Sequence, residues 1–191
     1  GTAKTVTNLA NAGVDQHLRL QMELDSINTD DTYIGFSDAF HDKYNYDNED
    51  APSRPGNGKL GLASFSSDSL RMAINKMQLP KKDPLTIPLS VNARATGLYK
   101  MNMTEIVAIP QVDEVWLMDS FRKDSLDMRQ HPTYGFNITS DTASQGNNRF
   151  KLVIRESAAL MVRLLSFTAS GTSSGSSLNW ATENEDWKSV V

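Results

Sequence analysis

The sequence predicts an all-β fold, an antiparallel β-sandwich of the jelly-roll or immunoglobulin-like kind. Apolar side chains recur at every second position in many short runs, the pattern of strands with one buried face. Gly, Pro, Asn, Asp and Ser separate these runs about every dozen residues, as in sandwiches. No stretch of the first 156 residues shows the periodicity of an amphipathic helix.

The first predicted strand covers residues 16–25. Its polar residues alternate with apolar ones, so that one face is buried and the other meets water. The apolar residues are Leu18, Leu20, Met22 and Leu24. A turn at Asp30 and Asp31 separates this strand from a shorter one at residues 33–36.

The middle of the chain continues the same pattern. Predicted strands lie on both sides of a turn at residues 66–68, and then at 85–91, 99–103, 114–118 and 125–129. In the strand after the turn, Leu70, Met72 and Ile74 are expected on one face. Pro88 favours an edge strand or a bulge, because Pro has no N–H for a ladder. Trp116, between Val115 and Leu117, is predicted to lie in the core.

Residues 133–156 contain the clearest alternation in the chain. Two runs each place three large apolar residues on one face: Tyr134, Phe136 and Ile138, then Phe150, Leu152 and Ile154. Turn-forming residues at 139–148 connect them. We interpret the two runs as a β-hairpin with a long loop, forming one wall of the core.

The composition changes after residue 156. A strand-like run at 160–167 precedes a stretch of Ser, Gly and Thr at 169–177, predicted as a loop, and a last strand at 178–182. A single strand of this kind cannot bury its own face. The expectation is a β-sandwich domain at 1–156, followed at 157–191 by a linker and the first strands of a second, truncated module.

Composition excludes several classes of function. The chain has 191 residues, 19 basic and 23 acidic, and its net charge of -4 does not suggest nucleic-acid binding. It contains no cysteine, which excludes disulfides, thiolate metal sites and a cysteine nucleophile. No apolar run reaches the length of a membrane-spanning helix, so membrane insertion is not expected.

Several motifs occur in a definite order. An acidic and aromatic segment at 38–50 leads into Lys59 and Leu60; the runs at 70–75, 115–119, 134–136 and 148–152 follow. In this order and spacing they resemble a β-sandwich region of large secreted and surface proteins of Bacteroidetes, found upstream of type IX secretion sorting domains. Residues 164–167 and 178–183 resemble the first strands of the immunoglobulin-like module that often follows.

The resemblance implies export to the cell surface or the extracellular space. It implies a role in adhesion, matrix binding or gliding, with glycans or other surface proteins as partners. Four triplets are similar to the O-glycosylation sequon that this phylum uses on exported proteins; they begin at Asp25, Asp68, Asp124 and Asp141.

The long loop at 37–58 is the best candidate for a binding site. Its acidic residues offer oxygen ligands of the kind that calcium prefers: Asp38, Asp42, Asp47, Glu49 and Asp50. The spacing does not match an EF-hand, and a solvated acidic loop is the alternative interpretation. Tyr44 and Tyr46 could instead stack on sugar rings, as in other sandwich lectins.

Enzymatic motifs are weak. Residues 171–175 match G-x-S-x-G, but they lie in a Ser/Gly stretch without the strand-to-helix turn that exposes a nucleophile. His17, His41 and His131 lack the spacing of a metal pair. We therefore expect a non-enzymatic extracellular module with an adhesive or structural role, or alternatively a carbohydrate-binding module that uses the loop at 37–58.

Overall fold

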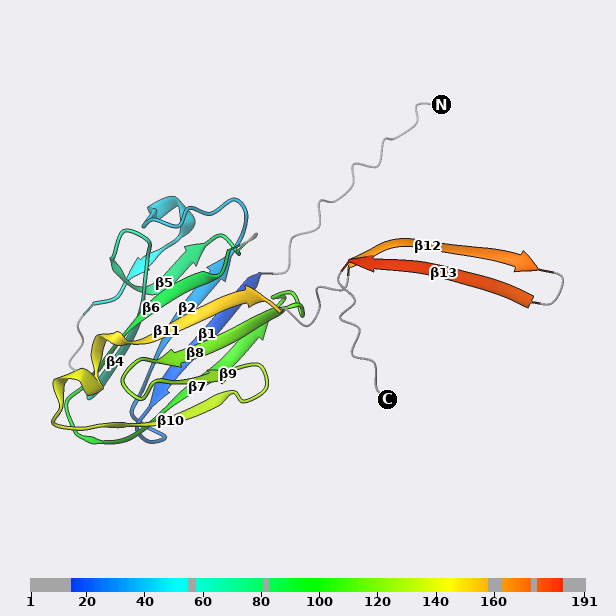
Figure 1. Ribbon diagram of the computed structural model, residues 1–191. Coiled ribbons are helices and arrows are strands. Elements are labelled where there is room, and N and C mark those ends of the chain that lie inside the picture. Colours follow the sequence, from blue (N-terminus) through cyan, green and yellow to red (C-terminus); the bar gives the residue numbers. More distant parts are fainter. Residues whose placement is uncertain (1–14, 55–57, 81–82, 158–162, 173–174, 184–191) are drawn as a thin grey trace, which may run out of the picture. The chain divides into compact units, whose positions relative to one another are not determined.

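The computed structural model describes residues 15–54, 58–80, 83–157, 163–172 and 175–183 (Figure 1). The chain divides into two compact units, Gly1–Arg155 and Glu156–Val191. In the described ranges the regular elements are strands, apart from two short 3-10 helices. The all-β prediction is confirmed.

The first unit contains eleven strands and the helices η1 and η2. In chain order they are β1 (Gln16–Glu23), β2 (Thr29–Phe36), η1 (Tyr46–Asn48), β3 (Ala51–Pro52), β4 (Leu60–Phe65), β5 (Arg71–Met77), β6 (Leu85–Ala93), β7 (Gly97–Val107), β8 (Asp113–Asp119), β9 (Asp124–Asp127), β10 (Thr133–Ile138), η2 (Thr142–Ser144) and β11 (Gly146–Glu156).

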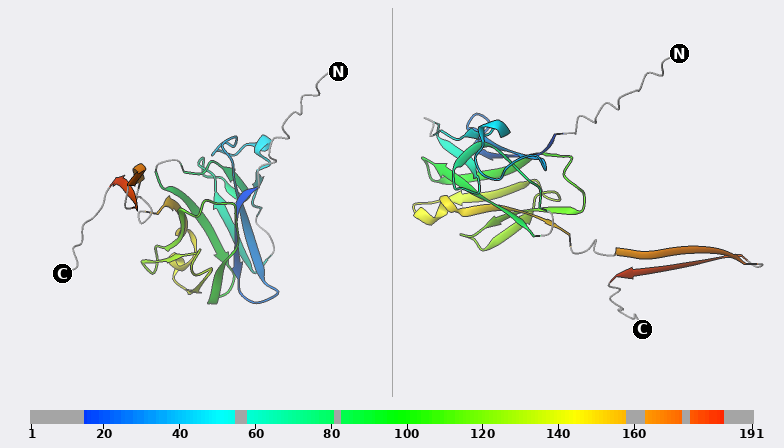
Figure 2. Two further views of the ribbon diagram at one scale, coloured as in Figure 1. Left: turned by 90° about the vertical axis from the view of Figure 1, so that its right-hand side faces the viewer. Right: turned by 90° about the horizontal axis from the view of Figure 1, so that it is seen from above.

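These strands form one mixed sheet, in the order β10-β7-β1-β2-β5-β4-β6-β11-β8-β9, with β3 paired to β5. β2 and β5 run parallel, and the other pairs with a described register run antiparallel. The sheet curls around its core and is nearly barrel-like (Figure 2). A continuous hydrogen-bonded order, rather than two separate sheets, therefore encloses the core.

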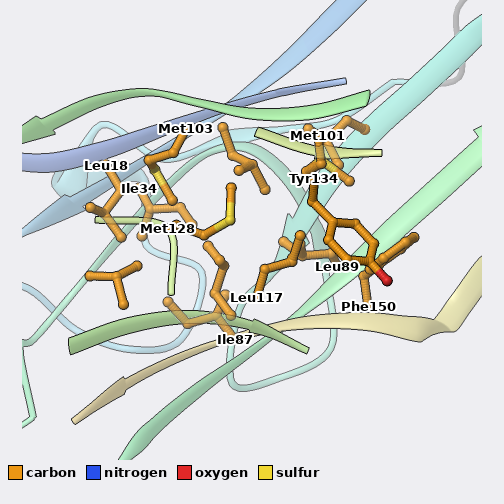
Figure 3. Close-up of a cluster of buried hydrophobic side chains, with 14 of the residues drawn as sticks. Leu18, Ile34, Ile87, Leu89, Met101, Met103, Leu117, Met128, Tyr134 and Phe150 are labelled. Atoms are coloured by element: carbon orange, nitrogen blue, oxygen red, sulfur yellow. The ribbon is translucent and has the colours of Figure 1, made fainter. Parts of the chain in front are cut away.

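The core is built from the faces that alternation predicts. The apolar positions of β1, β10 and β11 are buried as expected: Leu18, Leu20, Met22, Tyr134, Phe136, Ile138, Phe150, Leu152 and Ile154. Side chains from β2, β4, β5, β6, β7 and β8 belong to the same cluster, together with Ile109 and Met128. Figure 3 shows Tyr134 and Phe150 meeting inside it, beside Leu89 and Met101. Period-two patterning is thus a sound guide to which face is buried.

The predicted hairpin at 133–156 is wrong. β10 pairs with β7, and β11 lies between β6 and β8, so the two runs do not share a ladder. They meet through side chains instead: the rings of Phe136 and Phe150 lie 4.8 Å apart at 67°. Each of the two strands pairs with other strands of the sheet. The alternation of apolar residues carries no information about which strand will be the partner.

The prediction for Trp116 is also wrong. Val115 and Leu117 point into the core, so Trp116 lies on the outer face of β8 and is only half-buried. Its indole N–H donates to Glu114 Oε2 at 2.8 Å, and the Arg155 guanidinium lies 5.5 Å from its ring. Strict alternation outweighs the hydrophobicity of the single residue.

β5 departs from its predicted face because its partners change along its length. Met72 is buried as expected, but Leu70 and Ile74 are exposed and Asn75 is buried. The strand pairs with β4 at Met72 and with β2 from Ile74 onward. The Asn75 amide donates to the Phe65 carbonyl at 3.0 Å. Asn75, and not Ile74, therefore faces inward at the point where the partner strand changes.

Pro88 lies in β6, an interior strand, and not in an edge strand of the sheet. The described ladder between β4 and β6 covers Leu89 to Ala93, whereas Pro88 is opposite Lys151 of β11. The missing N–H is therefore tolerated where the ladder to β4 has ended.

The second unit contains β12 (Arg163–Thr172) and β13 (Gly175–Glu183), an antiparallel pair. Its register runs from Arg163 opposite Glu183 to Thr172 opposite Gly175. The Ser- and Gly-rich stretch predicted as a loop therefore lies largely within strands, because cross-strand pairing continues through it. Leu160 and Val162 of the predicted run lie outside the described residues.

A buried ion pair joins distant parts of the sheet order. The Arg149 guanidinium of β11 and the Asp119 carboxylate of β8 are each 2% exposed, and Nη2 lies 2.8 Å from Oδ2. Nη1 donates to the Asn137 carbonyl of β10 at 2.7 Å and also to the Ser144 carbonyl. The Tyr134 hydroxyl of β10 donates to Asp119 at 3.2 Å. β10 is thereby tied to β8 and β11, from which it is far removed in the sheet order.

Aromatic rings and backbone donors complete this site. The Arg149 guanidinium carbon lies 4.9 Å from the ring centre of Phe136 and 4.6 Å from that of Phe150. Burial by itself would raise the pKa of Asp119, but the bonds from Arg149 and from the Arg122 N–H outweigh it and hold that pKa below its ordinary value. Both charges are thus fully compensated.

Replacing Arg149 should destabilise the fold strongly. Arg149→Met leaves the Asp119 carboxylate buried without its cation, and breaking a buried pair in this way costs about 3–5 kcal/mol. Urea unfolding measures the loss. In a double-mutant cycle, Asp119→Leu with Arg149→Met should cost clearly less than the sum of the single changes. Additive losses would contradict the coupling.

Acid should weaken the fold through the same carboxylate. The folded-state pKa of Asp119 lies below the ordinary 3.8, so its contribution is present above that value and is lost as pH falls through the lower folded-state pKa. Thermal unfolding of the wild type between about pH 5 and 2 should show this loss. Asp119→Asn should be less stable at neutral pH and show a shallower decline; an unchanged slope would contradict the assignment.

Candidate functional site

The loop predicted as the binding site is largely structured. Within it, η1 forms a single turn, and β3 pairs with β5, with Ala51 opposite Ile74. The Asn45 side chain caps η1 by accepting the Asp47 N–H at 2.9 Å. Residues 55–57 of this loop lie outside the described part of the chain. The described portion is therefore anchored along β5.

Asp50 is the main anchor of the loop. It is buried, and its Oδ1 accepts the Lys76 N–H of β5 at 2.8 Å. Its Oδ2 accepts the Asn45 N–H at 2.9 Å. Both carboxylate oxygens are thus engaged with backbone donors, which is the stronger, charge-assisted kind of hydrogen bond.

Two of the other four acidic residues, Asp42 and Glu49, have different partners. Asp42 Oδ1 accepts the Gln78 N–H at 3.1 Å. Glu49 pairs with Lys76 Nζ at 2.7 Å, a hydrogen bond that lowers the pKa of its carboxyl. Asp38 and Asp47 are exposed. The carboxylates serve mainly to attach the loop to β5 and to the residues that follow it.

A calcium site needs several oxygens that converge on one point. Among the described residues, no three His, Cys, Asp or Glu side chains are grouped so that they could hold a metal ion. Calcium binding by Asp38, Asp42, Asp47, Glu49 and Asp50 stays a prediction without a ligand group to support it.

The two predicted ligand-binding tyrosines are both on the surface. Tyr46 is 81% exposed and Tyr44 is 37% exposed. The backbone beneath them is held, because the Tyr44 N–H donates to Asp68 Oδ1 at 3.2 Å and Asp50 fixes Asn45 between them. Hydrogen bonds from Ser66 and from this N–H lower the pKa of Asp68. The loop therefore displays two aromatic rings on an anchored backbone.

A charged network on the outer face of β1, β2 and β7 was not predicted. His17 Nε2 lies 2.8 Å from Glu105 Oε2, and its ring stacks on Tyr33 at 4.8 Å. Arg19 lies between Glu105 and Asp31, at 3.4 and 3.2 Å. Alternation places these residues on the outer face, but only the pairing of β1 with its neighbours brings them together.

This network resembles a catalytic cluster in composition only. The Tyr33 hydroxyl donates to Asp15 at 2.5 Å, and burial together with this carboxylate raises the pKa of Tyr33. A tyrosine held protonated in this way is a poor nucleophile at neutral pH. The neighbouring Arg19 is matched by carboxylates. We interpret the network as a set of surface ion pairs that join three strands.

The hydrolase-like motif is not supported by its surroundings. Gly171 and Thr172 end β12, and Gly175 begins β13. A strand follows the motif, whereas a nucleophile elbow leads into a helix. Residues 173 and 174 lie outside the described range.

Comparison of the chain with protein-family models, with curated proteins and with solved structures gave no match. No helix in the described ranges is long and apolar enough to cross a membrane.

Loosening the loop should leave most of the fold intact. Asp50→Ala removes two hydrogen bonds to backbone donors and should cost about 1–3 kcal/mol. Limited proteolysis should then cut within residues 38–49 faster than in the wild type. Asp47→Ala, at an exposed position of the same loop, is the matched control. Equal cutting of both variants and the wild type would contradict the role of Asp50.

Proposed function

We propose that this chain is a non-enzymatic, exported module of a larger bacterial surface or secreted protein, with an adhesive or structural role. The observation that carries the proposal is the anchored loop of residues 37–54. A buried carboxylate attaches it to β5, and it presents Tyr46 almost fully to solvent. The apolar side chains are packed in the core, whereas the loop exposes aromatic rings on an anchored backbone. This arrangement fits a role in binding other molecules at the surface.

Carbohydrate is the class of ligand that the displayed residues favour. Exposed aromatic rings on a fixed backbone can stack on the apolar faces of sugars at a small cost in side-chain entropy. Tyr44 and Tyr46 lie two residues apart on such a backbone, and Asp47 beside them offers an acceptor for hydroxyl groups. A lectin-like module that uses this loop is therefore the second candidate function.

The resemblance to Bacteroidetes surface proteins accounts for the proposed export. In all four sequon-like triplets the hydroxyl residue is exposed: Ser26, Ser69, Ser125 and Thr142. Asp25 and Asp141 accept backbone N–H groups just downstream, and Asp124 accepts the Ser125 N–H at the start of β9. Exposed acceptor residues are accessible to a modifying enzyme, which supports an extracellular or cell-surface location.

The same resemblance supports a more specific proposal for the fold within the all-β class. We place the first unit with jelly-roll or immunoglobulin-like sandwiches, since its curled sheet brings facing walls of strands together around one core. The second unit, with β12 and β13, would be the beginning of a further immunoglobulin-like module.

Removing the two rings tests whether the loop binds glycans. Tyr44→Ala with Tyr46→Ala should abolish retention on a glycan array or on immobilised polysaccharide, because stacking area is lost. The urea midpoint should stay close to that of the wild type, since neither ring belongs to the core.

A matched control is Leu98→Ala, which removes a large apolar side chain that is 63% exposed and lies outside the loop. Its glycan retention should match the wild type. Wild-type retention by the double variant would reject the tyrosine platform and leave the adhesive or structural role without this contact surface.

A further inference from the structure

A concave surface is formed by residues other than the two tyrosines. It is a cleft of about 640 Å³, formed where β2, β4 and β11 begin and β6 ends. The pairing of Leu60 with Ala93 and of Gly146 with Val91 brings these segments together at one end of the sheet. Neither Tyr44 nor Tyr46 lines it.

The cleft has an unusual charge for this chain. Four cationic side chains line it, from four separate segments: Arg54, Lys59, Arg71 and Arg94. Among the described lining residues the one carboxylate is Asp30, whose Oδ2 already accepts the Leu62 N–H at 2.8 Å. The whole chain carries a net charge of -4, so this positive surface is a local concentration.

These cations have no close counter-charge in the described part of the chain, although Lys59 has a longer-range coulombic interaction with the Asp25 carboxylate. Among the described residues, none of the four forms an ion pair within 4.0 Å, whereas Arg19, Lys76, Lys100, Arg149 and Arg155 all do. The Nε of Arg71 is buried without a hydrogen-bond acceptor in the described part of the chain. Like charges held together without counter-charges favour an anionic ligand.

The remaining lining residues indicate which kind of molecule bears the anionic group. Hydroxyl and amide side chains predominate, including Ser53, Asn92 and Gln145, and these groups bind sugar hydroxyls. The Gln145 oxygen accepts the Ala93 N–H at 2.7 Å, so its amide position is set. None of the described lining residues is aromatic, so the stacking platform that a nucleic-acid strand uses is missing here.

We propose that this cleft binds an anionic saccharide, in which a carboxylate or sulfate group contacts the arginines. Guanidinium groups match both anions with two parallel hydrogen bonds. The proposal rests on the cleft, to which the loop of residues 37–54 contributes Ser53 and Arg54, and it does not depend on the two tyrosines.

The test uses affinity electrophoresis with dextran sulfate, polygalacturonate and uncharged dextran in the gel. The wild type should be retarded by one or both anionic polymers but not by dextran, and salt should weaken the effect. Retardation by polygalacturonate alone identifies a carboxylate as the recognised group. Retardation by dextran sulfate alone identifies a sulfate. Lys59→Glu with Arg94→Glu should lower the affinity at least about tenfold, which corresponds to roughly 1.4 kcal/mol.

The control carries the same change of charge elsewhere. Lys100→Glu with Lys123→Glu alters two exposed cations that do not line the cleft, and it should bind within about twofold of the wild type, or roughly 0.4 kcal/mol. Equal losses in both double variants would show a general charge effect and overturn the proposal. So would the absence of retardation by either anionic polymer, or equally strong binding to polyglutamate. Urea midpoints verify that each variant is folded.

Discussion

The buried pair between Arg149 and Asp119 is the constraint on which the shape of the first unit depends. A strongly curled sheet must bring strands that are remote in its order face to face, and apolar contacts alone specify that meeting loosely. Here a guanidinium from β11 donates to a carboxylate on β8 and to a carbonyl of β10. Because every donor needs its acceptor, one relative position of these strands is selected. We infer that the pair contributes to the uniqueness of the fold more than to its net stability.

The first unit carries two candidate binding surfaces. The carboxylates of the loop at 37–54 are used as structural anchors, and that use frees the tyrosines to face solvent. The cationic cleft arises differently, from the meeting of four segments that are distant in the chain. Both proposals describe binding by contact, without chemistry on the ligand.

The surface cations differ in whether they have carboxylate partners. On the outer face of β1, β2 and β7, the cation Arg19 meets carboxylates from two neighbouring strands. In the cleft the cations remain without such partners among the described residues. Surface ion pairs contribute little to stability. The more informative observation is therefore which surface cations have no such pair among the described residues. The cluster of cations without close counter-charges among the described residues is the reason for proposing an anionic ligand in the cleft.

The sequence by itself determined that the chain is all-β and which side of most strands faces inward. This information is local: alternation from Leu18 to Met22 or from Phe150 to Ile154 decides the buried face without reference to any partner. Only the tertiary structure decided which strands are neighbours, and so it separated β10 from β11, placed Trp116 outside and shifted the inward phase within β5. It also gathered Lys59, Arg71 and Arg94 into one cleft. Strand pairing depends on contacts between residues far apart in the chain, and a pattern with a period of two is the same for every possible partner.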